Sequence, residues 1–388
     1  MDERRIRDLF PETPGLVYLN AAAAGLLPNA VIEAVGAAIR RHAERGVLSV
    51  PEDFRAIAAA RDALARLIGG RPEDIAFVLN TAEGIARIAA GLDWRPGDEV
   101  VLGDLEFPAN VYPWAAQADR GVRIRLVASE GGRLEAERLI GAMGPRTRVL
   151  AVSQVQFSSG YRMDLETLGR AAAERGVLFC VDAIQGLGVL PLDVRALKIG
   201  ALAGDGRKWL MAPSGTGYLY VAPEWVERIG ARAIGAVSVR NGLDFMQFLR
   251  MPDGEGRIDF RPLLREGAGR YEAGYYNAPG LAGLAAALST GEAIGLETIL
   301  DRVTSLVARL ADGLRARGLA VHGPRNAAER AGIVTFEVPG DAHVWLKQLE
   351  EDGFALALRD GRIRVSPHVY NTEDDIDGLL KRLSSLRG

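Results

Sequence analysis

Short apolar segments alternate with amphipathic helical patterns along much of the chain, and this alternation restricts the possible folds more than any other feature. Strands are predicted at Ile75–Val78, Glu99–Gly103, Arg123–Val127, Arg148–Val152, Leu178–Asp182, Ala201–Ala203 and Gly217–Val221. Helices are predicted between most of them, at Ala56–Ile68, Thr81–Gly91, Val111–Asp119, Glu135–Ala142 and Asp164–Arg175. Strands joined through helices normally run parallel, and continuous apolar strands indicate a sheet covered on both faces. We therefore expect an α/β fold with a mostly parallel sheet.

The pattern changes after Pro262. A long helical stretch is predicted at Leu281–Arg317. It precedes strand-like Gly332–Val338, helical His343–Glu351, short strands at Phe354–Leu358 and Arg362–Val365, and a final helix at Glu373–Leu386. This order is typical of a small α+β unit. We expect a large domain at 18–262 and a small α+β domain built from 1–17 and 263–388.

Charge and composition favour an ordinary cytoplasmic enzyme or binding protein. The formal net charge of −3 provides no strong field to recruit nucleic acid or an anionic membrane. The uncharged segments Gly15–Ile32 and Ala273–Gly291 are interrupted by Asn, Gly and Pro, which disfavours a signal peptide or a spanning helix. Cys180 is the single cysteine, so no internal disulfide can form, and the four histidines show no metal-ligand spacing.

Lysine is scarce in this chain, so each lysine is a candidate for chemistry that arginine cannot perform. Of 47 basic residues, only Lys198, Lys208, Lys347 and Lys381 are lysines. Lysine can form a Schiff base and can lose its proton near neutral pH. Lys208 lies in a glycine-flanked turn after the predicted strand Ala201–Ala203, and Asp182 ends the predicted strand Leu178–Asp182, so both face one crevice at the carboxyl edge of the sheet.

A lysine and an aspartate in one crevice suit pyridoxal phosphate (PLP). The amine of Lys208 can bind the cofactor aldehyde, and the carboxylate of Asp182 can keep the pyridine nitrogen protonated. A surface turn lysine and a strand-end aspartate that caps a loop form the structural alternative. Thr81 and Ala82 open a predicted helix, where free N–H groups and a hydroxyl can bind phosphate, or where an ordinary helix cap can form. Phe107 can cover a flat ring or pack in the core.

In combination, these residues resemble the class V aminotransferase family of fold-type I PLP enzymes. That family includes cysteine desulfurases, selenocysteine lyases and isopenicillin-N-epimerase-like proteins. The resemblance covers nearly the whole chain. It is carried by Tyr18-Leu-Asn20 with Gly25 and Pro28, by Thr81–Gly84, by Asp182-x-x-Gln185, by Lys208-Trp-Leu, by Arg270-Tyr-Glu-x-Gly274 and by Arg364-Val-Ser-Pro-His-x-Tyr370-Asn-Thr. The order and spacing of these motifs make the likeness specific.

The resemblance implies a PLP site with defined roles. Lys208 would hold the cofactor covalently, and Asp182 would pair with its pyridine nitrogen. Gln185 would contact the phenolic oxygen of the cofactor. Thr81 and the Ala82 N–H would hold its phosphate.

Further roles carry over to residues outside this core. Asn20 and Arg359 would bind the amino-acid substrate, with Arg359 on its carboxylate through two parallel donors. Phe107 would stack on the ring. Asp205 and Arg207 would lie at the cofactor.

The same resemblance implies a homodimer. The segment at 270–277 would reach across the dimer interface, so Tyr275 or Asn277 would complete the phosphate site of the partner. Its uncharged, tyrosine-rich composition suits an interface core.

Three departures separate the chain from the desulfurase branch. Phe107 stands where desulfurases stack a histidine, and Asp205-Gly206-Arg207 replaces their Ser-Gly-His. No cysteine lies in Gly353–Arg364, where desulfurases carry the persulfide-forming loop, and Cys180 is predicted to be buried and inert.

We therefore expect a PLP enzyme acting at the Cα of an amino acid. Its chemistry would be C–S/β-elimination lyase or aminotransferase chemistry, and not that of a persulfide-forming cysteine desulfurase. An amino-acid epimerase of the isopenicillin-N-epimerase-like type and a non-catalytic PLP-fold binding protein remain alternatives. A nicotinamide dehydrogenase is disfavoured, because the best glycine match, Gly186-Leu-Gly188, leads to Pro191 where a third glycine belongs.

Overall fold

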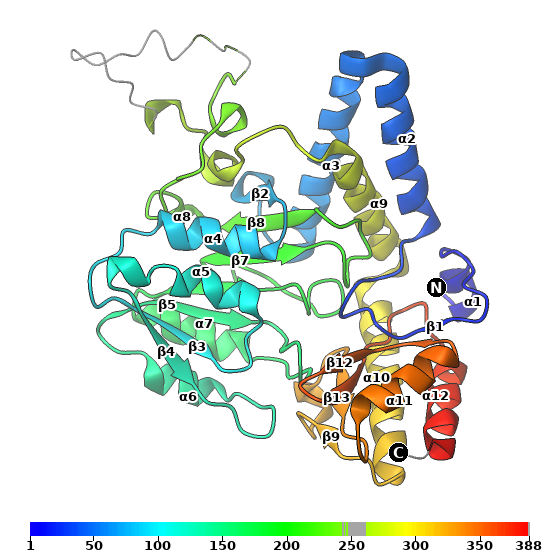
Figure 1. Cartoon of the computed structure of the whole chain (residues 1–388). Helices are drawn as coiled ribbons and strands as arrows, with labels where there is room; N and C mark the ends of the chain where they lie inside the picture. Colours follow the sequence, from blue (N-terminus) through cyan, green and yellow to red (C-terminus); the bar gives the residue numbers. More distant parts are fainter. Residues whose placement is uncertain (243, 245, 247–260, 387–388) are drawn as a thin grey trace.

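A seven-stranded sheet lies at the centre of the computed structural model, which describes residues 1–242, 244, 246 and 261–386. The sheet has the order β2-β8-β7-β6-β5-β3-β4 (Figure 1). Its strands are β2 (Ile75–Val78), β3 (Glu99–Gly103), β4 (Arg123–Val127), β5 (Thr147–Ser153), β6 (Leu178–Asp182), β7 (Ala201–Asp205) and β8 (Gly217–Val221). Only β8 runs antiparallel to its neighbours β2 and β7. The prediction of a mostly parallel sheet is confirmed.

Helices follow most of these strands and cover the sheet. They are α4 (Thr81–Gly91), α5 (Tyr112–Ala115), α6 (Ala136–Ala142), α7 (Leu165–Glu174) and α8 (Pro223–Val226). The helix predicted at Val111–Asp119 is wrong in extent, since α5 is one turn long and a separate 3₁₀ turn follows at Ala118–Arg120. That turn ends at Gly121, whose φ of 79° lies outside the helical region.

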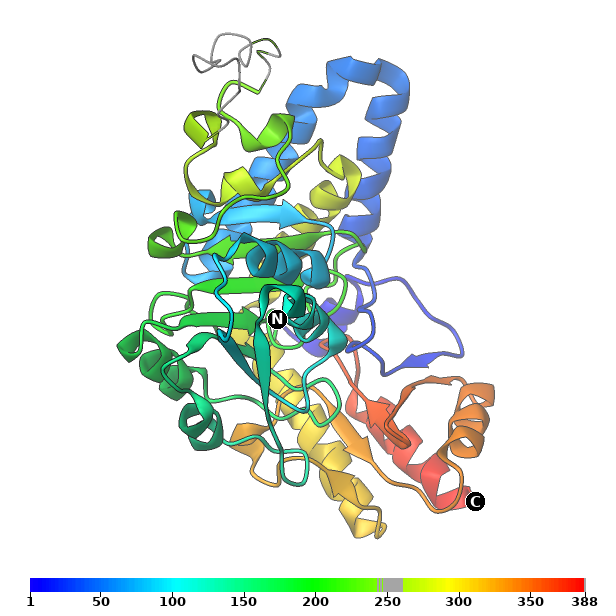
Figure 2. The ribbon, with the colours of Figure 1, turned by 60° about the vertical axis from the view of Figure 1, so that its left-hand side comes forward.

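A helical hairpin extends beyond the sheet (Figures 1 and 2). It is formed by α2 (Asn29–Arg45) and α3 (Val50–Ile68), and α9 (Ala278–Ile294) packs against both. The predicted helix over Leu281–Arg317 is two helices, because Gly295 at φ 91° separates α9 from α10 (Leu296–Ala316).

The C-terminal part contains a second, antiparallel sheet in the order β12-β13-β10-β9. Its strands are β9 (Val321–His322), β10 (Val334–Phe336), β12 (Ala357–Arg359) and β13 (Arg362–Val365), with helices α11 (Ala342–Glu351) and α12 (Glu373–Ser385). The N-terminal helix α1 (Glu3–Arg7) and strand β1 (Val17–Tyr18) join this part. Here β1 pairs in parallel with β11 (Phe354–Ala355).

Two hydrophobic clusters fill the interior. One surrounds the central sheet and includes the apolar face of α9. The other joins α1, α10, α12 and the second sheet, and it also takes in Trp209, which follows Lys208. The turn that carries Lys208 therefore lies where the two clusters meet. The domain limits expected from the sequence stay a prediction.

Within the residues described, no helix is long and apolar enough to cross a membrane.

Candidate active site

The carboxyl ends of β6 and β7 and the first turn of α4 open onto one cavity of about 440 Å³. Residues that end strands or begin helices dominate its wall. The cavity is lined by Leu79, Asn80, Thr81, Ala82, Phe107, Ala109, Asp182, Ile184, Asp205, Arg207, Lys208, Ser214 and Gly215. The structure thus brings together seven residues that the sequence singled out: Thr81, Ala82, Phe107, Asp182, Asp205, Arg207 and Lys208.

Lys208 is 6% exposed, and its Nζ lies 5.7 Å from the centroid of the Phe107 ring. Burial lowers the pKa of the Lys208 amine from its ordinary value, while the charge of Asp182 opposes this shift. A buried amine with a lowered pKa is a nucleophile that can also accept a proton.

The turn that presents Lys208 is held by groups from distant parts of the chain. Gly25 donates its N–H to the Arg207 carbonyl at 2.8 Å, and a Cβ at Gly25 would collide with the Lys208 carbonyl oxygen. The Trp209 indole donates to Gln185 Oε1 at 2.9 Å. His368 Nε2 contacts the Trp209 carbonyl at 3.1 Å, and its ring stacks on the indole with centroids 5.3 Å apart. The position of Lys208 is therefore set by both hydrophobic clusters.

Asp182 is 1% exposed at the end of β6, and its Oδ1 accepts the Ile184 N–H at 3.0 Å. Burial raises the pKa of Asp182 above its usual value, the nearby Glu106 carboxylate adds to this, and Lys208 opposes it. A buried carboxylate of this kind favours a partner that brings a proton, such as a pyridine nitrogen.

The opposite end of the cavity has free donors for a phosphate group. Asn80 Oδ1 accepts the Glu83 N–H at 3.0 Å and caps α4. Thr81 Oγ1 is buried and has no hydrogen-bond partner in the described part of the chain. An orphaned hydroxyl at a helix start, facing a cavity with a lysine and an aspartate, fits PLP.

Asp205 and Arg207 lie at this cavity but engage the protein itself. Asp205 Oδ1 accepts the Arg207 N–H at 2.9 Å, and Arg207 Nη1 donates to the Ala23 carbonyl at 3.0 Å. Burial raises the pKa of Asp205, while the Arg207 N–H and the charges of Arg207 and Lys208 oppose this shift.

Four residues expected in the site are absent from the cavity lining formed by the described residues. Gln185 is buried behind it, where its Nε2 donates to the Ala22 carbonyl at 3.1 Å. Asn20 Nδ2 donates to the Leu356 carbonyl at 3.0 Å. Tyr275 is 60% exposed, and its hydroxyl reaches Asp53 Oδ2 at 3.4 Å. Arg359 donates from Nη1 to the Leu358 carbonyl at 2.6 Å. Their proposed contacts stay predictions.

Arg364, which begins one of the motifs that carry the family resemblance, is a further functional candidate. It is 1% exposed on β13, and its Nη1 donates to the Phe157 carbonyl at 3.0 Å. Its Nε and Nη2 have no partner among the residues described. The Phe157 ring in turn meets the Phe107 ring at 5.1 Å, so Arg364 lies behind the wall of the cavity. Its charge also helps to lower the pKa of Lys208. The signal in the sequence was an arginine between the apolar residues Ile363 and Val365.

The model of the aminotransferase class-V family matches residues 17–379. The chain belongs to the class V aminotransferase family. A probable cysteine desulfurase of Pyrococcus abyssi is 29% identical, over 98% of this chain and 96% of the relative. A cysteine desulfurase of Klebsiella pneumoniae is 30% identical, over 96% of this chain and 93% of the relative.

Solved structures agree with this family assignment. The apo cysteine desulfurase of Thermococcus onnurineus NA1 superposes with a TM-score of 0.88 at 27% identity, covering 99% of this chain and 98% of that one. The cystine C–S lyase C-DES in complex with cysteine persulfide gives a TM-score of 0.87 at 26% identity, covering 97% and 99%. A C-DES variant with glycine covalently linked to the PLP cofactor gives 0.88 at 26% identity, covering 98% and 99%. This class V enzyme therefore has the fold-type I architecture and depends on PLP.

One expectation from the sequence is wrong. We expected lyase or aminotransferase chemistry distinct from that of a persulfide-forming cysteine desulfurase. The relatives that match nearly the whole chain are named cysteine desulfurases. The expectation rested on a cysteine missing from Gly353–Arg364 and on Phe107 replacing a histidine. Both changes leave the buried Lys208 and Asp182 in place at the cavity.

Proposed function

We propose that this class V enzyme cleaves the carbon–sulfur bond of L-cysteine or a closely related sulfur amino acid, as the names of its relatives indicate. The observation that carries the proposal is the buried Lys208 amine at one cavity with Asp182, backed by Arg364, whose Nε and Nη2 have no partner among the described residues. When bound, PLP supplies an electron-withdrawing ring that makes bonds to and next to the Cα of an amino acid easier to break.

The residues of the chain divide the remaining work. Thr81 Oγ1 and the Ala82 N–H bind the phosphate, and Asp182 holds a proton at the ring nitrogen. Phe107 covers the ring. Lys208 holds the cofactor aldehyde and then carries a proton at the Cα of the substrate, for which a buried amine with a lowered pKa is suited.

Arg364 binds the carboxylate of the substrate. Two unpaired donors on a rigid, buried guanidinium match the two oxygens of a carboxylate, and an incoming negative charge compensates the buried positive one. Arg359, expected from the sequence to bind this carboxylate, lies on the neighbouring strand β12. The two arginines are separable by mutation.

Sulfur release tests the proposal. Purified enzyme with PLP, L-cysteine and a dithiol reducing agent is expected to release sulfide. Alanine accompanies the sulfide if the dithiol takes up the sulfur and supplies the two electrons, and pyruvate with ammonia accompanies it if the sulfur leaves by β-elimination. Lys208→Ala should lower the rate by at least about 10³-fold, because both the covalent attachment and the proton transfer disappear. Lys347→Ala, an exposed lysine on α11, is the matched control and should keep the full rate. An enzyme loaded with PLP that releases no sulfide from cysteine or cystine would refute the proposal.

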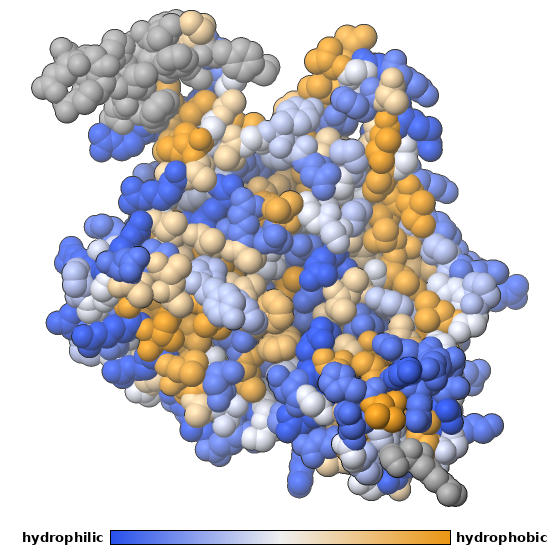
Figure 3. Space-filling model, in the orientation of Figure 1, coloured by the Kyte–Doolittle hydropathy of each residue, from blue (hydrophilic) through white to orange (hydrophobic). Residues whose placement is uncertain are grey.

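We also propose that the enzyme is a homodimer. Several large apolar side chains of the hairpin and the segment beside it are exposed: Val47 at 78%, Leu48 at 67%, Tyr275 at 60% and Phe54 at 46%. Figure 3 shows hydrophobic side chains along α2 and at the tip of this hairpin. A hollow of about 210 Å³ beside Tyr275 shares Leu79 and Gly215 with the active-site cavity, which supports a composite site.

Sedimentation velocity tests this assembly. The wild-type enzyme is expected to sediment as a dimer, and Leu48→Glu should shift it toward the monomer by placing a charge in the interface. A fully active, PLP-loaded monomer would contradict the proposal. The cytoplasmic location expected from the sequence stays a prediction.

A further inference from the structure

Glu106 is a buried carboxylate for which the mechanism above has no use. It is 6% exposed and lies between β3 and Phe107. Its Oε1 accepts from the Ser153 N–H and from Gln156 Nε2, both at 2.8 Å. Its Oε2 accepts from Ser153 Oγ at 2.5 Å and from Asn110 Nδ2 at 2.8 Å. Burial raises the pKa of Glu106 above its usual value, and the four hydrogen bonds oppose this shift because donors stabilise an ionised carboxylate.

The four donors are uncharged, and no basic side chain pairs with Glu106 in the part of the chain that is described. The Asn110 amide is fixed, because its Oδ1 accepts the Trp114 indole N–H at 3.2 Å. The negative charge of Glu106 is thus held in place without being neutralised.

Ser153 connects Glu106 to the cofactor site. It ends β5 and is the register partner of Asp182 on the parallel neighbour β6. Partners in register point to the same face of a sheet, with side chains about 5 Å apart. The next residue, Gln154, donates its N–H to the Asp182 carbonyl at 2.8 Å. Glu106 therefore lies one side chain away from Asp182, and its charge contributes to the raised pKa of Asp182.

Charge balance suggests what this carboxylate does. The charged groups that act on Asp182 are Glu106 and Lys208, and the buried Tyr218 hydroxyl faces the same region. Asp182 thus has one carboxylate, Glu106, and one amine, Lys208, as charged neighbours, while Asp205, Arg207 and Arg364 also act on Lys208. A protonated ring nitrogen at Asp182 would supply the second positive charge.

We propose that Glu106 is a positioning residue for PLP. The hydrogen-bonded carboxylate of Glu106 lies near Asp182 and favours a proton on the ring nitrogen, and the backbone of Glu106 places Phe107 across the cavity from Lys208. The inference rests on the proposed placement of the cofactor ring against Asp182. It does not depend on which amino acid the enzyme cleaves.

The charge effect is measurable in the apo enzyme. Carbon-13 NMR of labelled aspartate follows the titration of Asp182, which Asp182→Asn identifies. Glu106→Gln should lower the midpoint of Asp182 by about one pH unit, because a neighbouring negative charge is lost. A midpoint unchanged from wild type would overturn the proposal.

Two matched variants separate charge from loosened packing. Ser153→Ala removes one hydrogen bond to Glu106 and keeps the carboxylate, so the midpoint should stay within about 0.3 unit of wild type. The double variant Glu106→Gln/Gln156→Glu moves the carboxylate to the other side of the Glu106–Gln156 hydrogen bond. It should return the titration midpoint of Asp182 most of the way to the wild-type value. Equal shifts in Glu106→Gln and Ser153→Ala would show entry of water and would overturn the proposal.

The holoenzyme gives a second readout that needs no variant. With PLP labelled by nitrogen-15 in the ring, the nitrogen should remain protonated up to about pH 9 in the wild type. An unprotonated ring nitrogen at neutral pH would overturn the inference even if Glu106→Gln did not fold. Failure of sulfide release with normal titrations would refute the proposed function alone.

Discussion

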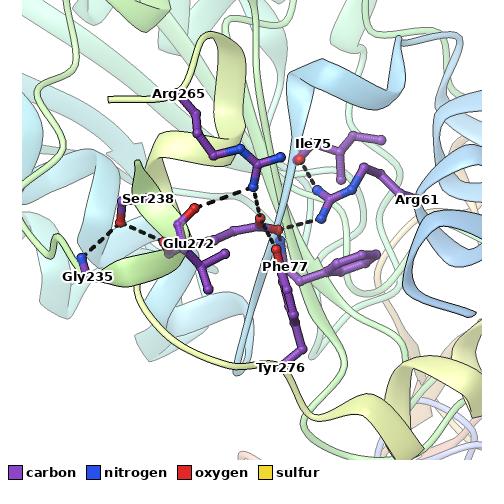
Figure 4. Close-up of polar contacts among 9 residues, drawn as sticks. Arg61, Ile75, Phe77, Gly235, Ser238, Arg265, Glu272 and Tyr276 are labelled. Carbon is purple, nitrogen blue, oxygen red and sulfur yellow. Dashed lines mark hydrogen bonds and ion pairs between the residues drawn. The ribbon is translucent and has the colours of Figure 1, made fainter. Parts of the chain in front are cut away.

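Two regions of this enzyme bury carboxylates in opposite ways. Glu272 lies under β2, where its carboxylate accepts from Arg61 at 2.8 Å, Arg265 at 3.3 Å, Tyr276 at 2.6 Å and the Phe77 N–H at 2.7 Å (Figure 4). Glu106, at the carboxyl edge of β3 and β5, is equally buried but accepts only from uncharged donors.

The difference teaches how to separate structural from functional charge. Glu272 is neutralised within the protein and attaches the segment before α9 to β2 and α3. The Ser238 hydroxyl donates to its carbonyl and attaches the same segment to the 3₁₀ turn Ala236–Ser238 (Figure 4). The charged groups around the cavity are not neutralised in this way. Arg364 Nε and Nη2 have no partner among the described residues, and Asp182 has the Glu106 carboxylate as its neighbour. Buried charge that the protein leaves uncompensated is suited to meet charge on a cofactor or substrate.

The largest expected effect concerns Arg364. Arg364→Leu should raise the KM for the amino acid by about 10²–10³-fold, because a charge-assisted contact worth roughly 3–4 kcal/mol is lost. The free energy of unfolding should change by less than about 1 kcal/mol, since the substitution removes an unpaired buried charge. Steady-state kinetics and denaturant unfolding of the same variant check both values.

Arg359→Leu is the matched control for this comparison. Arg359 is partly exposed and donates to its own neighbour Leu358, so its loss should change KM by less than about threefold. If Arg359→Leu raises KM strongly while Arg364→Leu does not, the carboxylate site belongs to Arg359 as the sequence predicted. Arg364 would then be a structural residue.

Glu272→Gln should do the reverse of Arg364→Leu: it should lower stability strongly and leave the cofactor site intact. It leaves two guanidiniums without their carboxylate, one of them with only 14% of its side chain exposed, and should lower the free energy of unfolding by about 3–4 kcal/mol. The PLP absorbance of the folded variant should be retained. Glu292→Gln, which breaks a surface pair with Arg66, should cost less than about 1 kcal/mol. If Glu272→Gln and Glu292→Gln lower the free energy of unfolding by similar amounts in urea, Glu272 is not the structural charge that we infer.

His368 buries an ionisable group in a third way, as a neutral ring. Its Nδ1 accepts the Val369 N–H at 2.6 Å, and burial lowers the pKa of His368 to about 4. Between about pH 6.5 and pH 4, His368 therefore binds a proton in the unfolded chain but not in the folded protein. The free energy of unfolding falls as the pH drops through this interval.

The loss over this interval should approach about 3 kcal/mol. His368→Phe should flatten this acidic limb in unfolding measurements while keeping the aromatic stack between Trp209 and Tyr370. An acidic limb of equal slope in the variant would assign the pH dependence to the carboxylates instead.

Much of the fold was predictable from the sequence, because strand patterns are local. Five of the seven central strands have the predicted bounds, and β5 and β7 differ by two residues or fewer at each end. The meeting of Lys208, Asp182, Thr81 and Phe107 followed from one rule, that the carboxyl ends of parallel strands share an edge.

The rest depended on contacts that no local pattern encodes. The choice between Arg359 and Arg364 depends on how a short hairpin packs on Phe157, and both residues lie in strands of similar composition. Nothing in the sequence distinguished Glu106 from other acids, because its four donors come from Ser153 at the end of β5, from Gln156 and from Asn110. Failure to predict the end of α9 had a different cause, since only a backbone angle at Gly295 marks it.

The smallest expected effect belongs to Cys180, a buried free thiol. Cys180 lies on β6, two residues before Asp182, and is 1% exposed. Burial raises the pKa of its thiol above the ordinary value, and the charges of Asp182 and Glu106 act in the same direction. Iodoacetamide should therefore leave Cys180 unmodified in the native enzyme and modify it fully after denaturation. Glu106→Gln should leave Cys180 equally resistant to iodoacetamide, because burial is the main cause of its raised pKa. Rapid labelling of the native wild-type enzyme would show that β6 opens to solvent. Water would then reach the carboxylates of Asp182 and Glu106, and the contrast with Glu272 would not hold.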